Sequence, residues 1–386
     1  MRDVSIIGIG QTPVGEHWEM GLRQLALSAV QAALQDAAVE QVDAVIVANA
    51  LGGNLSGQNH LGALVADYVG MVGVEALRVE AADASGGLAL RQGYLMVAGG
   101  AAETVLVLGV EKATDRTGSE RDTALTTALD ADYEAGPGAT PAALAALLMR
   151  RYMYEHGVTL EQFEGFSINA HANGSTNPFA MYRNKLRPGA FAKAPLVADP
   201  VNLFDSAPEG DGAAAVILTT TERGLDSVPH PVRVRSSAAA TDTLALHNRR
   251  DLLFLTAVNL AAGRAYERAG IGPDAIDLAE LHDSFTVLTA LQLEAAGFAP
   301  RGEGWKLAAE GVLGRDGRLP ISTFGGLKAR GNPLGATGVY QAVEIARQLR
   351  GDAGENQVPG ARLALALNLG GLGGTAVAHV FEAVGG

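Results

Sequence analysis

The feature that most constrains the fold is an order of apolar strands and small-residue helices that occurs twice along the chain. In the first half, short apolar runs predict buried strands at Val4–Ile9, Asp43–Asn49, Leu77–Ala82, Thr104–Glu111 and Gly212–Leu218. Helical spacing of apolar residues predicts helices at Leu22–Ala37 and Ser85–Val97. In the second half, a helix followed by a strand is predicted twice, at Asn259–Gly270 with Ile276–Leu281, and at Gly335–Arg350 with Leu363–Leu369. The order predicts an α/β protein with a duplicated unit and a parallel or mixed sheet covered on both faces.

Residues 112–200 interrupt the first of the two units. This segment begins with the polar stretch KATDRTGSERDT, contains Pro and Gly punctuation, and has two helical stretches of its own. We therefore expect an insertion that lies over the core. The expected division is an N-terminal half at residues 1–230, which includes the insertion, and a C-terminal half at residues 231–386.

The composition excludes several classes of site and partner. The 386 residues include no cysteine, which rules out disulfides, cysteine-ligated zinc, iron–sulfur clusters and a thiolate nucleophile. The net charge is −13 and no basic run is present, which argues against a nucleic-acid partner. The eight histidines lack ligand-like spacing, so we expect no metal site. The charge-free run Leu363–Phe381 is interpreted as strand, glycine turn and strand, not as a membrane helix, and we expect a cytoplasmic protein without a signal peptide.

Four segments carry residue types suited to chemistry. In VEAADASGG (Val79–Gly87), Asp83 lies at a strand-to-helix junction, where a helix N-terminus can hold an anion or activate a nucleophile; the alternative is a simple helix cap. In ELHDSFT (Glu280–Thr286), His282 could serve acid–base chemistry or be a buried, satisfied histidine. The glycines of GGLKARGNPLGATGVY (Gly325–Tyr340) allow close approach to a ligand or form a tight loop. LALNLGGLGG (Leu365–Gly374) lacks the spacing of a phosphate loop.

Taken together, these segments resemble the thiolase superfamily, and specifically its sterol-carrier-type and archaeal-type branch. Further motifs in the same order are IGIGQTPVGEHWE at residues 7–19, AHANGSTNPFA at 170–180, LFDSAPEGDGAAAV at 203–216 and NLGGLGGTAV at 368–377. The resemblance covers essentially the whole chain. It implies a duplicated five-layer αβαβα thiolase fold, usually dimeric, with an inserted loop domain that helps to hold coenzyme A. It also implies a role in lipid metabolism, with a coenzyme A thioester as substrate or ligand and no covalently bound cofactor.

The chain departs from the family at the two positions that carry thiolysis. The resemblance implies that Asp83 stands where the family has its nucleophilic cysteine, and that Asn332 stands where it has the base histidine of the GHP motif. His282 matches the branch, and Asn368 lies near the position where other branches carry a second catalytic cysteine. A carboxylate is a poor acyl carrier and an amide cannot accept a proton at neutral pH. We therefore do not expect ordinary Cys/His thiolase chemistry.

Three interpretations of the altered site remain open. In the first, the chain makes or breaks a carbon–carbon bond beta to a coenzyme A thioester, as in a retro-aldol cleavage, without any acyl-enzyme. Asp83, His282 or Tyr340 would be the base, and Asn332 with backbone groups near Gly371 would be donors. In the second, it is a non-catalytic acyl-CoA-binding or scaffold subunit. In the third, acetyl-CoA acetyltransferase activity survives.

Both the ligand contacts and the partners follow from the same resemblance. Substrate or coenzyme A contacts are predicted at Gly325, Gly335, Ala336 and Gly371. The predicted assembly is a homodimer. Some aldolases of the superfamily also bind a small OB-fold and zinc-ribbon protein that carries acyl-CoA, and the resemblance implies such a partner here.

Overall fold

The computed structural model describes residues 1–384, and its centre is a nine-stranded mixed sheet. The strands are β1 (Val4–Gln11), β2 (Ala44–Ala48), β3 (Glu75–Val79), β4 (Thr104–Glu111), β7 (Gly212–Thr220), β8 (Val232–Thr241), β9 (Leu278–Glu280), β10 (Leu363–Gly370) and β11 (Thr375–Ala383). Their order across the sheet is β3-β2-β4-β7-β1-β8-β11-β10-β9. The two halves of the sheet meet where β1 pairs with β8.

From this junction toward each edge of the sheet, the strands pair in the same sequence of antiparallel and parallel relations. In the first half, β1 and β7 are antiparallel, β7 and β4 are antiparallel, and β4 and β2 are parallel. In the second half, β8 with β11, β11 with β10, and β10 with β9 repeat these three relations. The parallel pair of β2 and β3 corresponds to a single bridge between Ala279 and Ile321. The duplication expected from the sequence order is therefore present in the topology.

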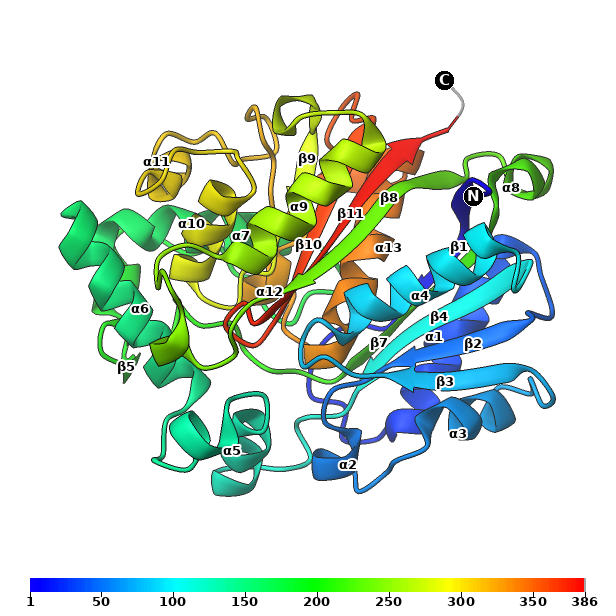
Figure 1. The fold of residues 1–386 in the computed structure, drawn as a ribbon, viewed down its shortest axis with the longest axis horizontal. Helices are drawn as coiled ribbons and strands as arrows, with labels where there is room; N and C mark the ends of the chain where they lie inside the picture. The colour runs from blue at the N-terminus through cyan, green and yellow to red at the C-terminus, as the bar shows by residue number, and fades with distance from the viewer. Residues whose placement is uncertain (385–386) are drawn as a thin grey trace.

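Helices cover both faces of the sheet and also fill the space between its halves (Figure 1). The longer helices are α1 (Leu22–Ala37), α3 (Leu61–Tyr68), α4 (Ser85–Gly99), α5 (Ser119–Thr126), α6 (Pro141–His156), α7 (Glu164–Gly174), α9 (Thr256–Ala269), α10 (Thr286–Ala295) and α13 (Thr337–Arg350). The short helices are α2 (Gly52–Leu55), α8 (Thr221–Ser227), α11 (Gly304–Ala309) and α12 (Gly326–Ala329). Helices α4 and α13 pack against each other, α1 packs on β1, and α9 packs on β8. This arrangement gives the five layers αβαβα.

The strands are apolar on both faces because each face contacts a different core. In β4, Leu106 and Leu108 belong to the cluster beneath α1, whereas Val105 and Val107 belong to the cluster beneath α4 and α13. Successive side chains point to opposite faces of a strand, so a strand that is buried on both faces is apolar at nearly every position. Each fully buried Val or Leu contributes about 1.5–3 kcal/mol. The continuous apolar runs in the sequence therefore identify these strands.

The segment between β4 and β7 leaves the sheet and covers its second half. It contains α5, α6, α7 and a small hairpin of β5 (Leu196–Ala198) and β6 (Val201–Asn202). Helix α6 packs against α10, and α7 packs against α12; Figure 1 shows α6 beside α10 at one end of the molecule. The inserted segment therefore lies over the loops that follow the strands. The division of the chain at residue 230 stays a prediction. Among residues 1–384, no helix is long and apolar enough to cross a membrane.

Candidate active site

A cavity of about 930 Å³ lies between the inserted segment and the loops of both halves. Three of the predicted site residues line it: Asp83, Asn332 and Gly371. Its walls come from α5, from the start of α6, from α7, and from loop residues 181–186 and 203–209. A mostly apolar concave site with a few convergent polar groups is typical of a small-molecule site. The polar groups of this cavity therefore decide its chemistry.

Asp83 projects from the turn that connects β3 to α4. The turn is tight, with Ala82 at φ 52°, and it is held by Ser85, whose Oγ accepts from Ala81 N at 2.9 Å. The residue that precedes α4 is Ala84, so Asp83 is not the helix cap. Its side chain is 21% exposed, and its Oδ2 lies 3.5 Å from His282 Nε2. The capping alternative is wrong, and Asp83 and His282 are brought together.

The hydrogen bonds around His282 determine which ring nitrogen carries the proton. The amide of Gly87 donates to Asn368 Oδ1 at 2.9 Å, so the other end of that side chain is the Nδ2 donor. Asn368 Nδ2 lies 3.3 Å from His282 Nδ1, which must therefore act as the acceptor. The proton of a neutral ring is then on Nε2 and points toward Asp83. Gln292 fixes the backbone of His282 through two bonds of 3.0 Å and 2.8 Å.

Asn332 is also held in one orientation. Its Oδ1 accepts from Leu334 N at 3.1 Å and from Thr337 Oγ1 at 2.7 Å. Its backbone is fixed by Pro208 O at 2.8 Å and by Gly210 N at 3.0 Å. Among residues 1–384, none accepts a hydrogen bond from its Nδ2. We infer that Nδ2 is the donor that this buried amide can offer to a ligand in the cavity.

Tyr340 does not lie with these residues. Its ring is fully buried in the core between the two halves of the sheet, and its hydroxyl donates to Thr12 O at 2.9 Å. The guanidinium of Arg330 lies 4.9 Å from the centre of the ring. Burial raises the pKa of the Tyr340 phenol, so it cannot supply a phenolate near neutral pH. The proposal of Tyr340 as a base is therefore corrected, because its side of α13 faces the core.

Of the four predicted ligand contacts, only Gly371 lines the cavity. Gly335 has a packing role, since a Cβ there would lie 2.4 Å from the backbone nitrogen of Ala50. Ala336 belongs to the core cluster between the sheet halves. Gly325 has φ 108°, which a side chain would strain. Gly325 and Gly335 therefore serve the close packing of the chain, and of the four predicted ligand contacts only Gly371 reaches the cavity.

The cavity also contains charged groups that the sequence patterns did not single out. Lys328 is 2% exposed, donates to Asp205 O, and has a pKa that burial lowers. Glu209 lines the same cavity, and burial raises its pKa. Lys328 lies in the glycine-rich motif at residues 325–340, and Glu209 lies in the motif at residues 203–216. Each motif also contains other charged residues, Asp205 and Asp211 in one and Arg330 in the other, so no local pattern singled out Lys328 or Glu209.

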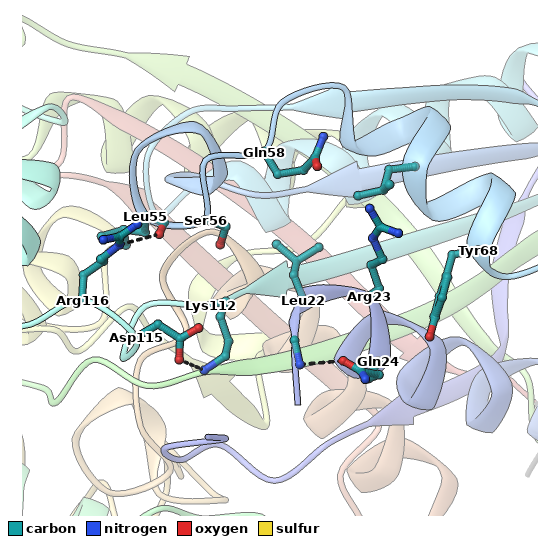
Figure 2. Close-up of a pocket in the computed structure, with 12 residues that line it drawn as sticks. Leu22, Arg23, Gln24, Leu55, Ser56, Gln58, Tyr68, Lys112, Asp115 and Arg116 are labelled. Atoms are coloured by element: carbon teal, nitrogen blue, oxygen red, sulfur yellow. Dashed lines mark hydrogen bonds and ion pairs between the residues drawn. The ribbon is translucent and has the colours of Figure 1, made fainter. Parts of the chain in front are cut away.

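A second hollow, of about 550 Å³, lies beside the start of α1 (Figure 2). Its buried lysine, Lys112, is paired with Asp115 at 2.5 Å and Asp211 at 2.6 Å. Opposite charges in direct contact leave this lysine little capacity to bind another anion. None of the predicted site residues lines the hollow. The 930 Å³ cavity is therefore the candidate active site.

Comparison with known proteins agrees with the fold and with the motif order. The family model described as "Thiolase, N-terminal domain" matches residues 4–193, and that described as "Thiolase C-terminal domain-like" matches residues 238–383. An acetyl-CoA acetyltransferase of Methanothermobacter thermautotrophicus is 44% identical over 99% of this chain and 100% of its own length. Sterol carrier protein 2 of Rattus norvegicus is 32% identical over 98% of this chain and 72% of its own length.

A solved structure described as the Ltp2-ChsH2(DUF35) aldolase is also similar along its whole length. It has a TM-score of 0.85 and 27% identity, and the match covers 99% of this chain and 98% of the compared chain. The strand order, the two family models and the relatives all indicate the same family. The chain belongs to the thiolase superfamily, in the branch that includes archaeal acetyl-CoA acetyltransferases and sterol carrier protein 2.

Proposed function

We propose that this protein makes or breaks a carbon–carbon bond beta to a coenzyme A thioester by aldol chemistry, without an acyl-enzyme. The observation that carries the proposal is a carboxylate, Asp83, opposite a buried imidazole N–H in a chain that has no cysteine. A thioester enolate is the intermediate that both thiolysis and aldol cleavage require. An aldol cleavage needs a base for the hydroxyl and donors for the thioester oxygen, but no nucleophile.

Each polar group of the site then has one task, where Asp83 and Asn332 line the cavity and His282 lies behind them in contact with Asp83. The carboxylate of Asp83 takes the proton of the β-hydroxyl, and the electrons of the O–H bond form the carbonyl of the first product. The electrons of the broken carbon–carbon bond move to the thioester and form its enolate. His282 Nε2–H and Asn332 Nδ2 donate hydrogen bonds to the enolate oxygen. Protonation of the α-carbon completes the shortened acyl-CoA.

Hydrogen-bond donors that are shielded from water stabilise the enolate more than donors in bulk water do. His282 is fully buried and Asn332 is 5% exposed, and neighbouring hydrogen bonds fix both side chains before a ligand arrives. Removing one such donor costs about 100- to 1,000-fold in kcat in enzymes that stabilise an oxyanion. The imidazole therefore serves as donor and positioning group, and the carboxylate serves as base.

The names of the relatives support the ligand class and a partner. Two of the similar proteins reported above are named for acetyl-CoA transfer and for an aldolase, and the aldolase is a complex with a DUF35 protein. We infer that the present chain binds acyl-CoA, acts on lipid-derived substrates in the cytoplasm as a homodimer, and can carry a small acyl-CoA-binding partner. The 44% identity to an acetyl-CoA acetyltransferase favours a second candidate, residual acetyl transfer.

The test compares binding with turnover. Calorimetric titration of the full chain with acetyl-CoA and with a longer acyl-CoA measures whether the pocket binds the ligand class. Cleavage of a set of β-hydroxyacyl-CoA compounds is then followed for the wild type, Asp83→Asn and His282→Ala. We expect micromolar binding in all three and cleavage only in the wild type. Asp67→Asn, on the exposed surface of α3, is the matched control.

Two outcomes would contradict the proposal. Binding without any cleavage would identify a scaffold subunit. Cleavage of acetoacetyl-CoA by free coenzyme A, at a rate unaffected by Asp83→Asn, would identify a surviving acetyltransferase.

A further inference from the structure

The cavity contains a second carboxylate that the scheme above does not use. Glu209 lines the same walls as Asp83 and Asn332. Its backbone runs beside that of Asn332: Asn332 N donates to Pro208 O at 2.8 Å, and Gly210 N donates to Asn332 O at 3.0 Å. The backbone of Glu209 is therefore held at a fixed position relative to Asn332, one of the two proposed enolate donors.

The segment that carries Glu209 is anchored on both sides. On one side, Ala207 N donates to Ser284 O at 2.8 Å. On the other, the buried carboxylate of Asp211 accepts from Ala113 N at 2.7 Å and from Thr114 N at 2.8 Å. A group held on rigid elements keeps its geometry during a reaction better than one on a free loop. The backbone of Glu209 is thus held by the fold, and its half-buried side chain lies on the cavity wall.

The surroundings of Glu209 favour its protonated form. Burial is the largest effect and raises its pKa, and the nearby charges of Asp83 and Asp122 raise it further, against the opposing charge of Arg121. Glu16 is a further acid on the cavity wall. Two carboxyl groups whose environments separate their proton affinities are a common basis for dividing acid and base roles. Asp83, which also lines the cavity and lies 3.5 Å from His282 Nε2, is the carboxylate assigned above as the base.

We propose that Glu209 is the general acid that protonates the α-carbon of the thioester enolate. This inference rests on the proposed aldol function and assigns the one proton transfer left open there. The carboxylic acid of Glu209 gives its proton to the α-carbon, and the enolate electrons form the new C–H bond. Asp83 has gained the hydroxyl proton and Glu209 has lost its own, so exchange with solvent restores both. In the direction of bond formation, the Glu209 carboxylate removes the α-proton.

Other ionisable groups of the cavity are less suited to this transfer. Lys328 donates to Asp205 O and lies near two carboxylates, those of Asp205 and Asp283. Burial lowers the pKa of His171, and its Nδ1 contacts a backbone oxygen at 3.2 Å. The guanidinium of Arg121 does not release a proton at neutral pH. Glu209 combines a raised pKa with a backbone that is held beside Asn332.

Hydrogen exchange at the α-carbon isolates this step from bond cleavage. The full chain is incubated with acetyl-CoA in deuterium oxide, and deuterium in the acetyl methyl group is measured by mass spectrometry. Exchange needs the enolate donors and the Glu209 carboxylate, which removes the α-proton and returns a deuteron, but not the base that acts on the hydroxyl. Glu209→Gln should therefore lower both exchange and cleavage by about 100-fold or more. Asp83→Asn should lower cleavage and leave exchange within a few-fold of the wild type.

The controls separate this inference from the proposed function. Glu209→Asp keeps the acid with a shorter reach and should retain part of the exchange, and Glu222→Gln, on the exposed surface of α8, should change nothing. Binding of acetyl-CoA should be equal in all variants. If the wild type exchanges and Glu209→Gln exchanges equally fast, Glu209 is not the acid and the proposed function stands. If the wild type neither exchanges nor cleaves, both proposals fail.

Discussion

Asp83 Oδ2 and His282 Nε2 lie 3.5 Å apart, although the two residues come from different halves of the duplicated fold. The distance is longer than an ordinary N–H···O hydrogen bond, and His282 Nε2 has no hydrogen-bond partner among the described residues. The direction of the imidazole proton depends on a third residue, Asn368, which contacts the other ring nitrogen. The site is therefore assembled from the β3–α4 turn, the loop before α10 and the end of β10.

The tautomer of His282 should depend on Asn368. In Asn368→Asp, a carboxylate can accept from both the Gly87 amide and Nδ1–H, so the ring proton should move from Nε2 to Nδ1. The oxyanion would lose its donor, and kcat should fall by about 100-fold. Nitrogen-15 chemical shifts of the ring report the tautomer directly. Unchanged shifts together with unchanged kcat would contradict the assignment.

Tyr340→Phe tests the correction of the predicted base. The variant removes a hydrogen bond from the phenol to Thr12 O inside the core. The free energy of unfolding should decrease by about 1 kcal/mol, because the carbonyl is left without this donor. Cleavage of β-hydroxyacyl-CoA should stay within a few-fold of the wild type. A loss of turnover without a loss of stability would restore Tyr340 as a catalytic residue.

The crossing of α4 and α13 should not tolerate a side chain. A Cβ at Gly338 would lie 2.3 Å from Asn368 Oδ1 and 2.3 Å from Gly87 N. Gly338→Ala should therefore destabilise the protein by about 1–3 kcal/mol and displace Asn368. Gly263→Ala is the control, because nothing lies within 4 Å of its new Cβ on α9. That change should stabilise the protein by about 0.5–1 kcal/mol, as measured by urea unfolding.

Stability should decrease as the pH rises from about 4.5 to about 8 and level off above that. Burial, followed by the nearby carboxylate of Glu344, raises the pKa of Glu280 to about 8, and burial also raises the pKa of Glu344. A raised carboxyl pKa means that the folded state holds a proton that the unfolded state loses near pH 4.5, so this stabilisation decreases steadily above that pH and is fully lost once the pH exceeds the folded pKa. Urea unfolding at several pH values measures the slope. Glu344→Gln should flatten it, and an equally steep slope in that variant would exclude this pair as its source.

The sequence was most informative where burial is complete. Strands such as β4 were identified because both faces are apolar, and the order of helices and strands predicted the duplication. Strand β8 was not predicted, because it alternates with Arg233 and Arg235 and its pattern is weaker. Asp83 and His282 could be identified from their motifs, and the structure adds their contact.

The sequence could not separate ligand contacts from packing contacts. Gly335 and Tyr340 lie in the same motif as Asn332, yet they face the core, because successive residues of a turn and helix point in different directions. Glu209 could not be located from a local pattern, because its neighbours in the cavity come from distant parts of the chain. Backbone pairing with Asn332, together with the hydrogen bond from Ala207 N to Ser284 O, brings it to the site.

The most direct test of the account is whether a carbon–carbon bond is cleaved without an acylated protein. The full chain is mixed with a β-hydroxyacyl-CoA, and both the products and the intact protein mass are followed by mass spectrometry over one turnover. We predict a free aldehyde or ketone and a shortened acyl-CoA, with no acyl group on the protein, and no products from Asp83→Asn. A protein that gains an acyl group before product appears would contradict the proposed chemistry.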